Sequence, residues 1–176
     1  MTSFLLAMVA GAAWVVGQCG QYYSYSKIGV SETMPLSTGL QLIGVPLVGV
    51  LIFGEWASTQ AKLFGFLGIL ALVVGVAFTS LTDKGTAEGN KQNQTSTMII
   101  LALTTLGYIT SSSIPKALKG DGVMIFLGQT IGMMIATFIY LVATKQLKVL
   151  KEKESYQVIP AGVIFAIAAL SYIISV

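Results

Sequence analysis

Six long stretches without a charged residue dominate this sequence. Its 176 residues include ten Lys, no Arg and seven acidic residues, which gather in short clusters between these stretches. The stretches are Phe4–Tyr25, Pro35–Gly54, Leu63–Leu81, Met98–Ile114, Val123–Thr144 and Val158–Val176. Each has roughly 17 to 22 residues, which at a rise of about 1.5 Å per residue matches a hydrocarbon core of about 30 Å. We therefore expect six membrane-spanning helices.

Composition excludes several other classes of protein. Only 10% of the residues are charged, whereas soluble domains are about a quarter charged. The stretches are too long for the strands of a membrane barrel and do not alternate, so the expected fold is all-α, a polytopic membrane helix bundle. Because the lysines lie between the spans and there is no Arg, membrane topology explains them better than a nucleic-acid partner does.

Several chemistries are also excluded. The chain has one cysteine, Cys19, and no His, so neither a disulfide within the chain nor a transition-metal site is expected. No ionisable side chain other than Cys and Tyr lies within a stretch, and no phosphate-binding glycine loop is present. We expect neither an enzyme nor a cofactor.

The lysines also indicate how the chain is oriented. The first, third and fifth gaps between stretches hold seven of them and the other two gaps hold three, so the first group is expected to be cytoplasmic. The longest gap is polar and divides the chain: residues 1–81 hold three spans of a first half, 82–97 form a cytoplasmic linker, and 98–176 hold three spans of a second half. Three spans on each side would give the two halves opposite orientations in the membrane, as in the inverted repeats of many transporters. Because the last span has no polar flank, we expect it to be truncated.

Polar side chains within the spans are the candidates for a binding site, because they cost free energy in a bilayer unless they are paired or line a path. In the first span one helix face carries Trp14, Gln18, Gln21, Tyr22 and Tyr25. Amides supply donors and acceptors, and aromatic rings stack on sugars, so this face suits a neutral polyol. Alternatively, the glutamines bond between helices and the tyrosines form an aromatic belt.

The second span adds a further polar face. Pro35 is expected at the helix start, and Ser37, Thr38 and Gln41 follow at spacings of three and four. Pro46 is expected to interrupt the helix and to kink it. Transporters place their sites at such discontinuous helices. Close packing of small residues around a harmless kink is the alternative.

The remaining candidates lie in other spans. One face of the fourth span carries Thr104, Tyr108, Ser111, Ser112 and Pro115, although serine and threonine can also bond to carbonyls of their own helix. Gln129 lies inside the GxxxG spacing of Gly128 and Gly132, which indicates first a packing surface. Glu55, beside Trp56 at the end of the second span, is the candidate carboxylate for proton coupling, with a plain surface charge as the alternative.

One block of the sequence carries a family resemblance. The segment Gly29–Gly44 (GVSETMPLSTGLQLIG), followed by Phe53–Trp56 (FGEW), resembles bacterial glucose/ribose uptake permeases of the drug/metabolite transporter superfamily. The resemblance implies ten helices in two inverted halves of five, with proton-coupled sugar uptake across the cell membrane. This chain would then hold helices three to eight. It departs from the expected pattern at Ala166–Ala169, where a tryptophan and a polar residue are expected.

We therefore expect a secondary transporter that takes up a monosaccharide, glucose or ribose, by alternating access. Its site would comprise Gln18, Gln21, Tyr22, Ser37, Thr38 and Gln41, with Trp14, Tyr108 and Gln129 as further members. The expected partners are the sugar, the lipid bilayer and protons, while self-association stays open. One rival is an efflux permease for drugs or metabolites, which would need an apolar cavity. The other is a non-transporting scaffold or an inactive fragment, in which the polar residues only join helices.

Overall fold

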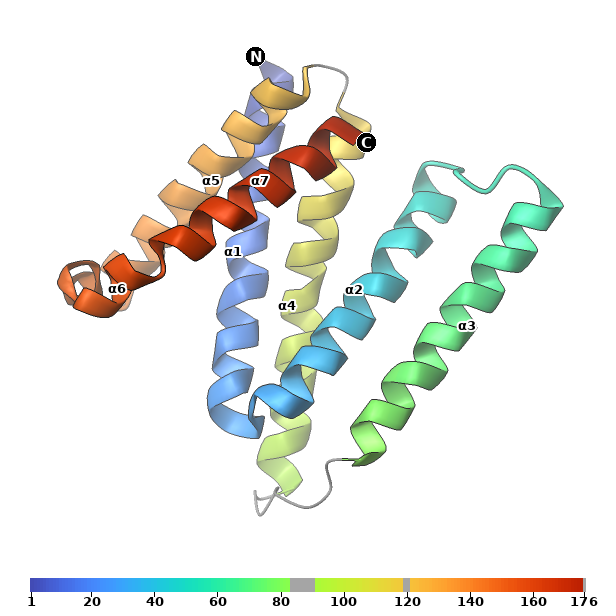
Figure 1. Cartoon of the computed structure of the whole chain (residues 1–176), viewed down its shortest axis with the longest axis horizontal. Coiled ribbons are helices and arrows are strands. Elements are labelled where there is room, and N and C mark those ends of the chain that lie inside the picture. The colour runs from blue at the N-terminus through green and yellow to red at the C-terminus, as the bar shows by residue number, and fades with distance from the viewer. Residues whose placement is uncertain (83–90, 119–120, 176) are drawn as a thin grey trace. The chain divides into compact units, whose positions relative to one another are not determined.

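The computed structural model describes residues 1–82, 91–118 and 121–175 and shows a chain of helices (Figure 1). The elements are α1 (Thr2–Ile28), α2 (Val30–Ile52), α3 (Thr59–Thr82), α4 (Lys91–Ala117), α5 (Gly122–Ala143), the 3-10 helix η1 (Leu147–Lys151), α6 (Lys153–Gln157) and α7 (Ile159–Ser175). The described ranges contain no strand. The predicted all-α membrane fold is confirmed.

Five of these helices, α1 to α5, are long and apolar enough to cross a membrane. The sixth predicted span forms α7, which is apolar but has only 17 residues. At about 1.5 Å per residue such a helix is roughly 25 Å long, somewhat less than the hydrocarbon core.

Two helix starts differ from the prediction. Helix α4 begins at Lys91, inside the predicted linker 82–97, of which residues 83–90 lie outside the described ranges. Helix α2 begins at Val30, so Pro35 lies within it and not at its start. A helix satisfies its own backbone groups and can therefore continue beyond the hydrocarbon core. The linker and the two halves stay predictions.

The predicted interruption at Pro46 is wrong, because α2 continues through Pro35 and Pro46. A proline removes one backbone donor, and the hydrogen bonds of the neighbouring turns can hold the helix together across it. The kink at Pro46 stays a prediction.

The helices pack as two units: residues 1–15 with 114–176 form the first, and residues 16–113 form the second. In the first unit α5 packs against α7, and the start of α1 packs against α5 through glycines. A Cβ atom on Gly132 would collide with the Met8 carbonyl, and one on Gly11 with the Gln129 carbonyl. The GxxxG spacing therefore forms the packing surface that the sequence indicated.

In the second unit α2 and α3 form an antiparallel pair (Figure 1). The remainder of α1 runs antiparallel to α4, because Gly17 contacts Tyr108 while Gly20, one turn later, contacts Thr104. Gly44 of α2 lies against the Ile109 side chain of α4. Glycines thus mark the closest helix contacts in this unit too.

We predict that Gly132→Ala destabilises the first unit. The added methyl group meets backbone atoms of α1, which cannot move aside as a side chain can, so the expected cost is about 1 to 3 kcal/mol. The measurement is the midpoint of thermal unfolding in detergent. Gly68→Ala in α3 is the matched control, because a Cβ atom there has nothing within 4 Å; alanine's helix propensity should leave that midpoint unchanged or raise it. Equal effects of the two substitutions would contradict the packing argument.

Candidate functional site

Three of the predicted site residues meet between α1 and α4 in the second unit. The Tyr108 side chain is only 5% exposed, and its hydroxyl lies 2.5 Å from both the Oε1 of Gln18 and the Oε1 of Gln21. Gln21 is 8% exposed and Gln18 is half-buried. We call Gln18, Gln21 and Tyr108 the amide-phenol cluster.

Glycines on α1 create the room for this cluster. A Cβ atom on Gly17 would lie 2.8 Å from two carbons of the Tyr108 ring, a distance that side chains do not tolerate. Gly20 accommodates the Thr104 side chain in the same way, one turn further along. The ring of Tyr108 can therefore lie flat on α1 and carry its hydroxyl to the glutamines.

The hydrogen bonds of the cluster are not all satisfied within it. A phenol has one proton, so the Tyr108 hydroxyl cannot donate fully to two carbonyl oxygens at once. The Nε2 of Gln21 donates to the Met34 sulfur over 3.2 Å. The Nε2 of Gln18 has no hydrogen-bond partner in the described part of the chain. The cluster thus keeps both donor and acceptor capacity.

Met34 is a neighbour of the cluster that sequence reasoning missed. A single residue, Gly29 at φ 81°, joins α1 to α2 and brings Met34 back against α1. There its sulfur accepts from the Tyr25 hydroxyl at 2.7 Å and from Gln21. Methionine counts as apolar in a hydropathy reading, and only the glycine between two apolar stretches could have signalled the tight turn.

The polar residues of α2 do not share one environment. Ser37 is fully buried, and its hydroxyl accepts a hydrogen bond from the Gln41 Nε2 at 3.2 Å. Thr38 is exposed and lines a groove between α2 and α3, together with Gly39 and Gly75. The structure therefore pairs Ser37 with Gln41 and separates Thr38 from them.

The other predicted members of the site lie apart from the cluster or outside its unit. Tyr22 is 59% exposed, and its ring pairs with that of Tyr25 at 5.8 Å between centroids. Trp14 belongs to the first unit, where its ring lies 5.4 Å from that of Phe165. Gln129 is buried on the packing face of α5.

Two threonine hydroxyls of α4 favour the structural alternative. Thr104 and Thr105 donate to backbone carbonyls of the preceding turn, Thr104 to Ile100 at 2.9 Å and Thr105 to Leu101 at 2.7 Å. Such bonds satisfy a hydroxyl without any ligand. The Tyr108 hydroxyl differs from these two threonine hydroxyls, because its side-chain hydrogen bonds reach glutamines of another helix.

Glu55 lies just beyond α2 on an exposed turn. Gly54 adopts φ 65°, which turns the chain back, so that the Glu55 N–H donates to the Gly49 carbonyl at 3.1 Å. The Glu55 carboxyl group lies over Gly49, where a Cβ atom would not fit. Trp56 packs edge-on against Phe66 at 5.4 Å. The carboxyl group is thus positioned against α2 at the exposed end of a span.

Comparison with known proteins shows which family this chain resembles. The family described as sugar transport protein matches residues 1–176. A Lactobacillus johnsonii protein named for sugar uptake is 68% identical over 173 residues, which are 98% of this chain and 60% of that protein. A Latilactobacillus sakei protein named for ribose uptake is 40% identical, with 98% and 59% covered.

A glucose uptake protein of Staphylococcus xylosus is 37% identical over 139 residues, which are 79% of this chain and 48% of that protein. No solved structure matches the chain. The chain spans about 60% of the length of the Lactobacillus johnsonii relative. The family match covers every residue, so this chain belongs to the sugar transport protein family and not to a family of enzymes.

Proposed function

We propose that the protein is a secondary transporter that takes up a monosaccharide, glucose or ribose, across the cell membrane by alternating access. The relatives are named for uptake of sugar, ribose and glucose. In this proposal the amide-phenol cluster binds hydroxyl groups of the sugar. The observation that carries it is the half-buried Gln18 amide nitrogen, which has no partner in the described part of the chain.

The position of Gln18 along α1 indicates what kind of partner its amide nitrogen has. Gln18 lies close to the middle of α1, a 27-residue apolar helix. In hydrocarbon an amide without a hydrogen bond costs roughly 2 to 7 kcal/mol. An accessible amide at that depth is therefore expected to face a polar ligand or water, and substrate sites of transporters lie near the midplane.

A sugar hydroxyl complements this cluster because it both donates and accepts. It can accept from the Gln18 amide and donate to the glutamine oxygen that the single Tyr108 proton leaves unsatisfied. A drug-like apolar substrate would leave both groups unpaired, which costs free energy. The cluster therefore favours a polyol over the amphipathic substrates of an efflux permease.

The turn at Gly29 is the hinge between α1 and α2 in the proposed alternating access. Gly29 has φ 81°, and nothing lies within 4 Å of the place that a Cβ atom would take. A change of its backbone angles would move α2 against α1 and separate Met34 from Gln21. The released Gln21 amide could then bind sugar, so substrate binding would be coupled to the angle between the two helices.

We predict that Gln18→Ala raises the sugar concentration for half-maximal uptake about tenfold, because one or two hydrogen bonds of about 1 kcal/mol each are lost. The measurement is initial uptake of radiolabelled glucose and ribose by cells that express the gene encoding this chain. Gln157→Ala, at the exposed end of α6, is the control. Unchanged uptake of both sugars at equal protein levels would exclude Gln18 from the site.

Tyr108→Phe should lower uptake while thermal stability changes little. The substitution keeps the ring on Gly17 and removes only the hydroxyl that lies between the two glutamines. Uptake and the unfolding midpoint in detergent are measured together. Tyr23→Phe, on an exposed position of α1, should leave uptake unchanged. A large loss of stability without a change in uptake per folded molecule would indicate that the hydroxyl only joins α1 to α4.

We further propose that Glu55 carries the coupled proton. Glu55→Gln keeps the shape that packs over Gly49 and removes the ionisable group. Accumulation of sugar against its gradient should be lost, while exchange of labelled for unlabelled sugar, which needs no net proton movement, should continue. Glu32→Gln, in the first turn of α2, is the control. Accumulation that persists in the Glu55 variant would show that this carboxylate is a surface charge.

A further inference from the structure

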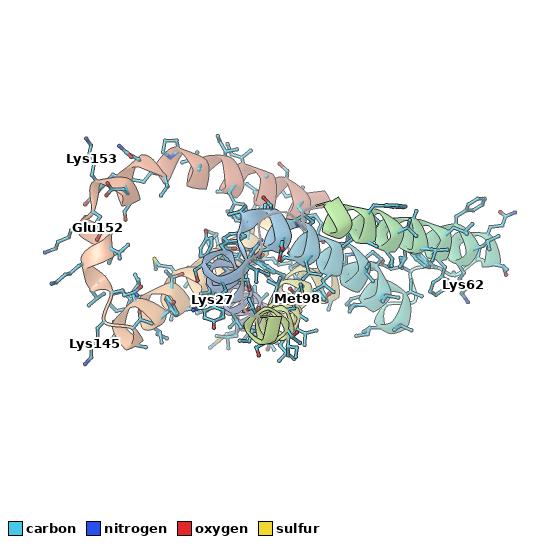
Figure 2. All side chains as sticks on the ribbon, turned by 90° about the horizontal axis from the view of Figure 1, so that it is seen from below. Lys27, Lys62, Met98, Lys145, Glu152 and Lys153 are labelled. Atoms are coloured by element: carbon cyan, nitrogen blue, oxygen red, sulfur yellow. The ribbon has the colours of Figure 1, made fainter. Side chains whose placement is uncertain are left out.

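The turn between α5 and α7, in the first unit, concentrates positive charge. It contains Lys145, Lys148, Lys151 and Lys153, all of them exposed. Figure 2 shows Lys145 and Lys153 at the outer edge of this turn, with their side chains directed away from the helices. Glu152 and Glu154 are the acidic residues of the turn, so four lysines against two glutamates leave an excess of positive charge.

The 3-10 helix η1 places its lysines and its leucines on separate faces. With about three residues per turn, side chains three apart in a 3-10 helix lie directly above one another. Lys148 and Lys151 therefore share one face, and Leu147 and Leu150 share another. The two leucines are 42% and 50% exposed. The short helix thus presents a cationic face beside an uncovered apolar face.

The backbone at the start of this turn adopts a conformation that is unfavourable for the lysine found there. Lys145 adopts φ 57°, a conformation that glycine favours. Its N–H donates to the Val142 carbonyl, and the N–H of Gln146 donates to the Leu141 carbonyl, which closes the end of α5. A lysine in this conformation is less favourable than a glycine, because its Cβ atom crowds the neighbouring carbonyl oxygen. The geometry alone would favour glycine, so the lysine side chain is expected to contribute something else.

Hydrogen bonds within the turn also connect its two short helices, η1 and α6. The Ser155 hydroxyl of α6 donates to the Val149 carbonyl of η1 at 2.6 Å, and the Glu152 N–H donates to the same carbonyl at 3.1 Å. The two short helices therefore have a fixed relation to each other. The lysine and leucine faces are positioned in advance and do not have to be ordered when a partner binds.

We propose that the segment Lys145–Tyr156 lies in the membrane interface and binds the headgroups of anionic phospholipids. Its place at the end of the α5–α7 hairpin puts it where apolar helices leave the hydrocarbon core. Lys148 and Lys151 meet the lipid phosphates, and Leu147 and Leu150 insert among the upper acyl carbons, as in other interfacial amphipathic segments. Charge complementarity selects a lipid surface as the partner, because the uncovered apolar face adjoins the cationic one.

The test measures lipid selectivity at the turn. A fluorophore is attached at Gln146→Cys in a Cys19→Ser background, and the whole chain is reconstituted in phosphatidylcholine bilayers. Brominated phosphatidylglycerol or brominated phosphatidylcholine then replaces part of the lipid and quenches the fluorophore when it lies nearby. The brominated anionic lipid should quench at a several-fold lower mole fraction than the neutral one. Raised salt should reduce this difference.

Three variants test which lysines cause the selectivity for anionic lipid. Lys148→Gln with Lys151→Gln should remove most of the selectivity, because each lysine near an anionic surface contributes about fivefold in affinity. Lys145→Gly should lower the selectivity while the unfolding midpoint stays the same or rises, since glycine relieves the backbone. Lys62→Gln, which removes one positive charge at the start of α3, should change nothing.

Equal quenching by the two brominated lipids in the labelled protein with all its lysines in place would overturn the proposal. So would selectivity that survives the double lysine substitution. The experiment contains no sugar, so its outcome does not depend on whether the protein transports one.

Discussion

Close contact between helices at glycine is the interaction on which both packing units depend. In a bilayer there is little hydrophobic gain when two apolar helices meet, so association rests on close van der Waals contact and on polar groups. Gly11 and Gly132 allow α1 and α5 to touch through their backbones. Gly17 and Gly20 allow α4 to approach the second part of α1 in the same way. A single helix therefore presents glycines to two different partners.

The candidate site is a consequence of the same contacts. The Tyr108 hydroxyl reaches Gln18 and Gln21 because its ring occupies the space above Gly17. The packing that holds α1 against α4 thus also fixes the positions of the polar groups. This explains how three uncharged side chains can form a defined cluster, because the glycine contacts between the helices set their positions.

Helical spacing predicted much of this arrangement but not all of it. Charge-free stretches located the spans, and spacings of three and four placed Gln18 and Gln21 on one face. The same spacings also grouped Trp14, Tyr22 and Thr38 with the site, although Trp14 pairs with Phe165 and Thr38 lines a groove beside α3. Periodicity defines a direction around a helix axis. Which neighbour occupies that direction depends on tertiary packing, which no local pattern contains.

Helix ends and turns show a similar limit. Pro35 and Pro46 suggested a start and an interruption, but α2 contains both residues, because the loss of one donor is small beside the hydrogen bonds that remain. Met34 was overlooked, since its role depends on a turn that only the backbone reveals. The lysines after α5 were read as a signal of topology, while their separation from the leucines required the three-residue period of η1.

The single-residue connection at Gly29 has a geometric consequence for the sequence around it. The N–H of Gly29 bonds to the Tyr25 carbonyl and its own carbonyl accepts from Thr33, so the chain reverses with its hydrogen bonds continuous on both sides. Each helical residue turns the chain by about 100°. If the turn keeps its shape, adding or removing one residue would shift the sequence of α2 by one helical position and carry Met34 away from Tyr25. The contacts of Met34 with Tyr25 and Gln21 therefore constrain the length of this connection.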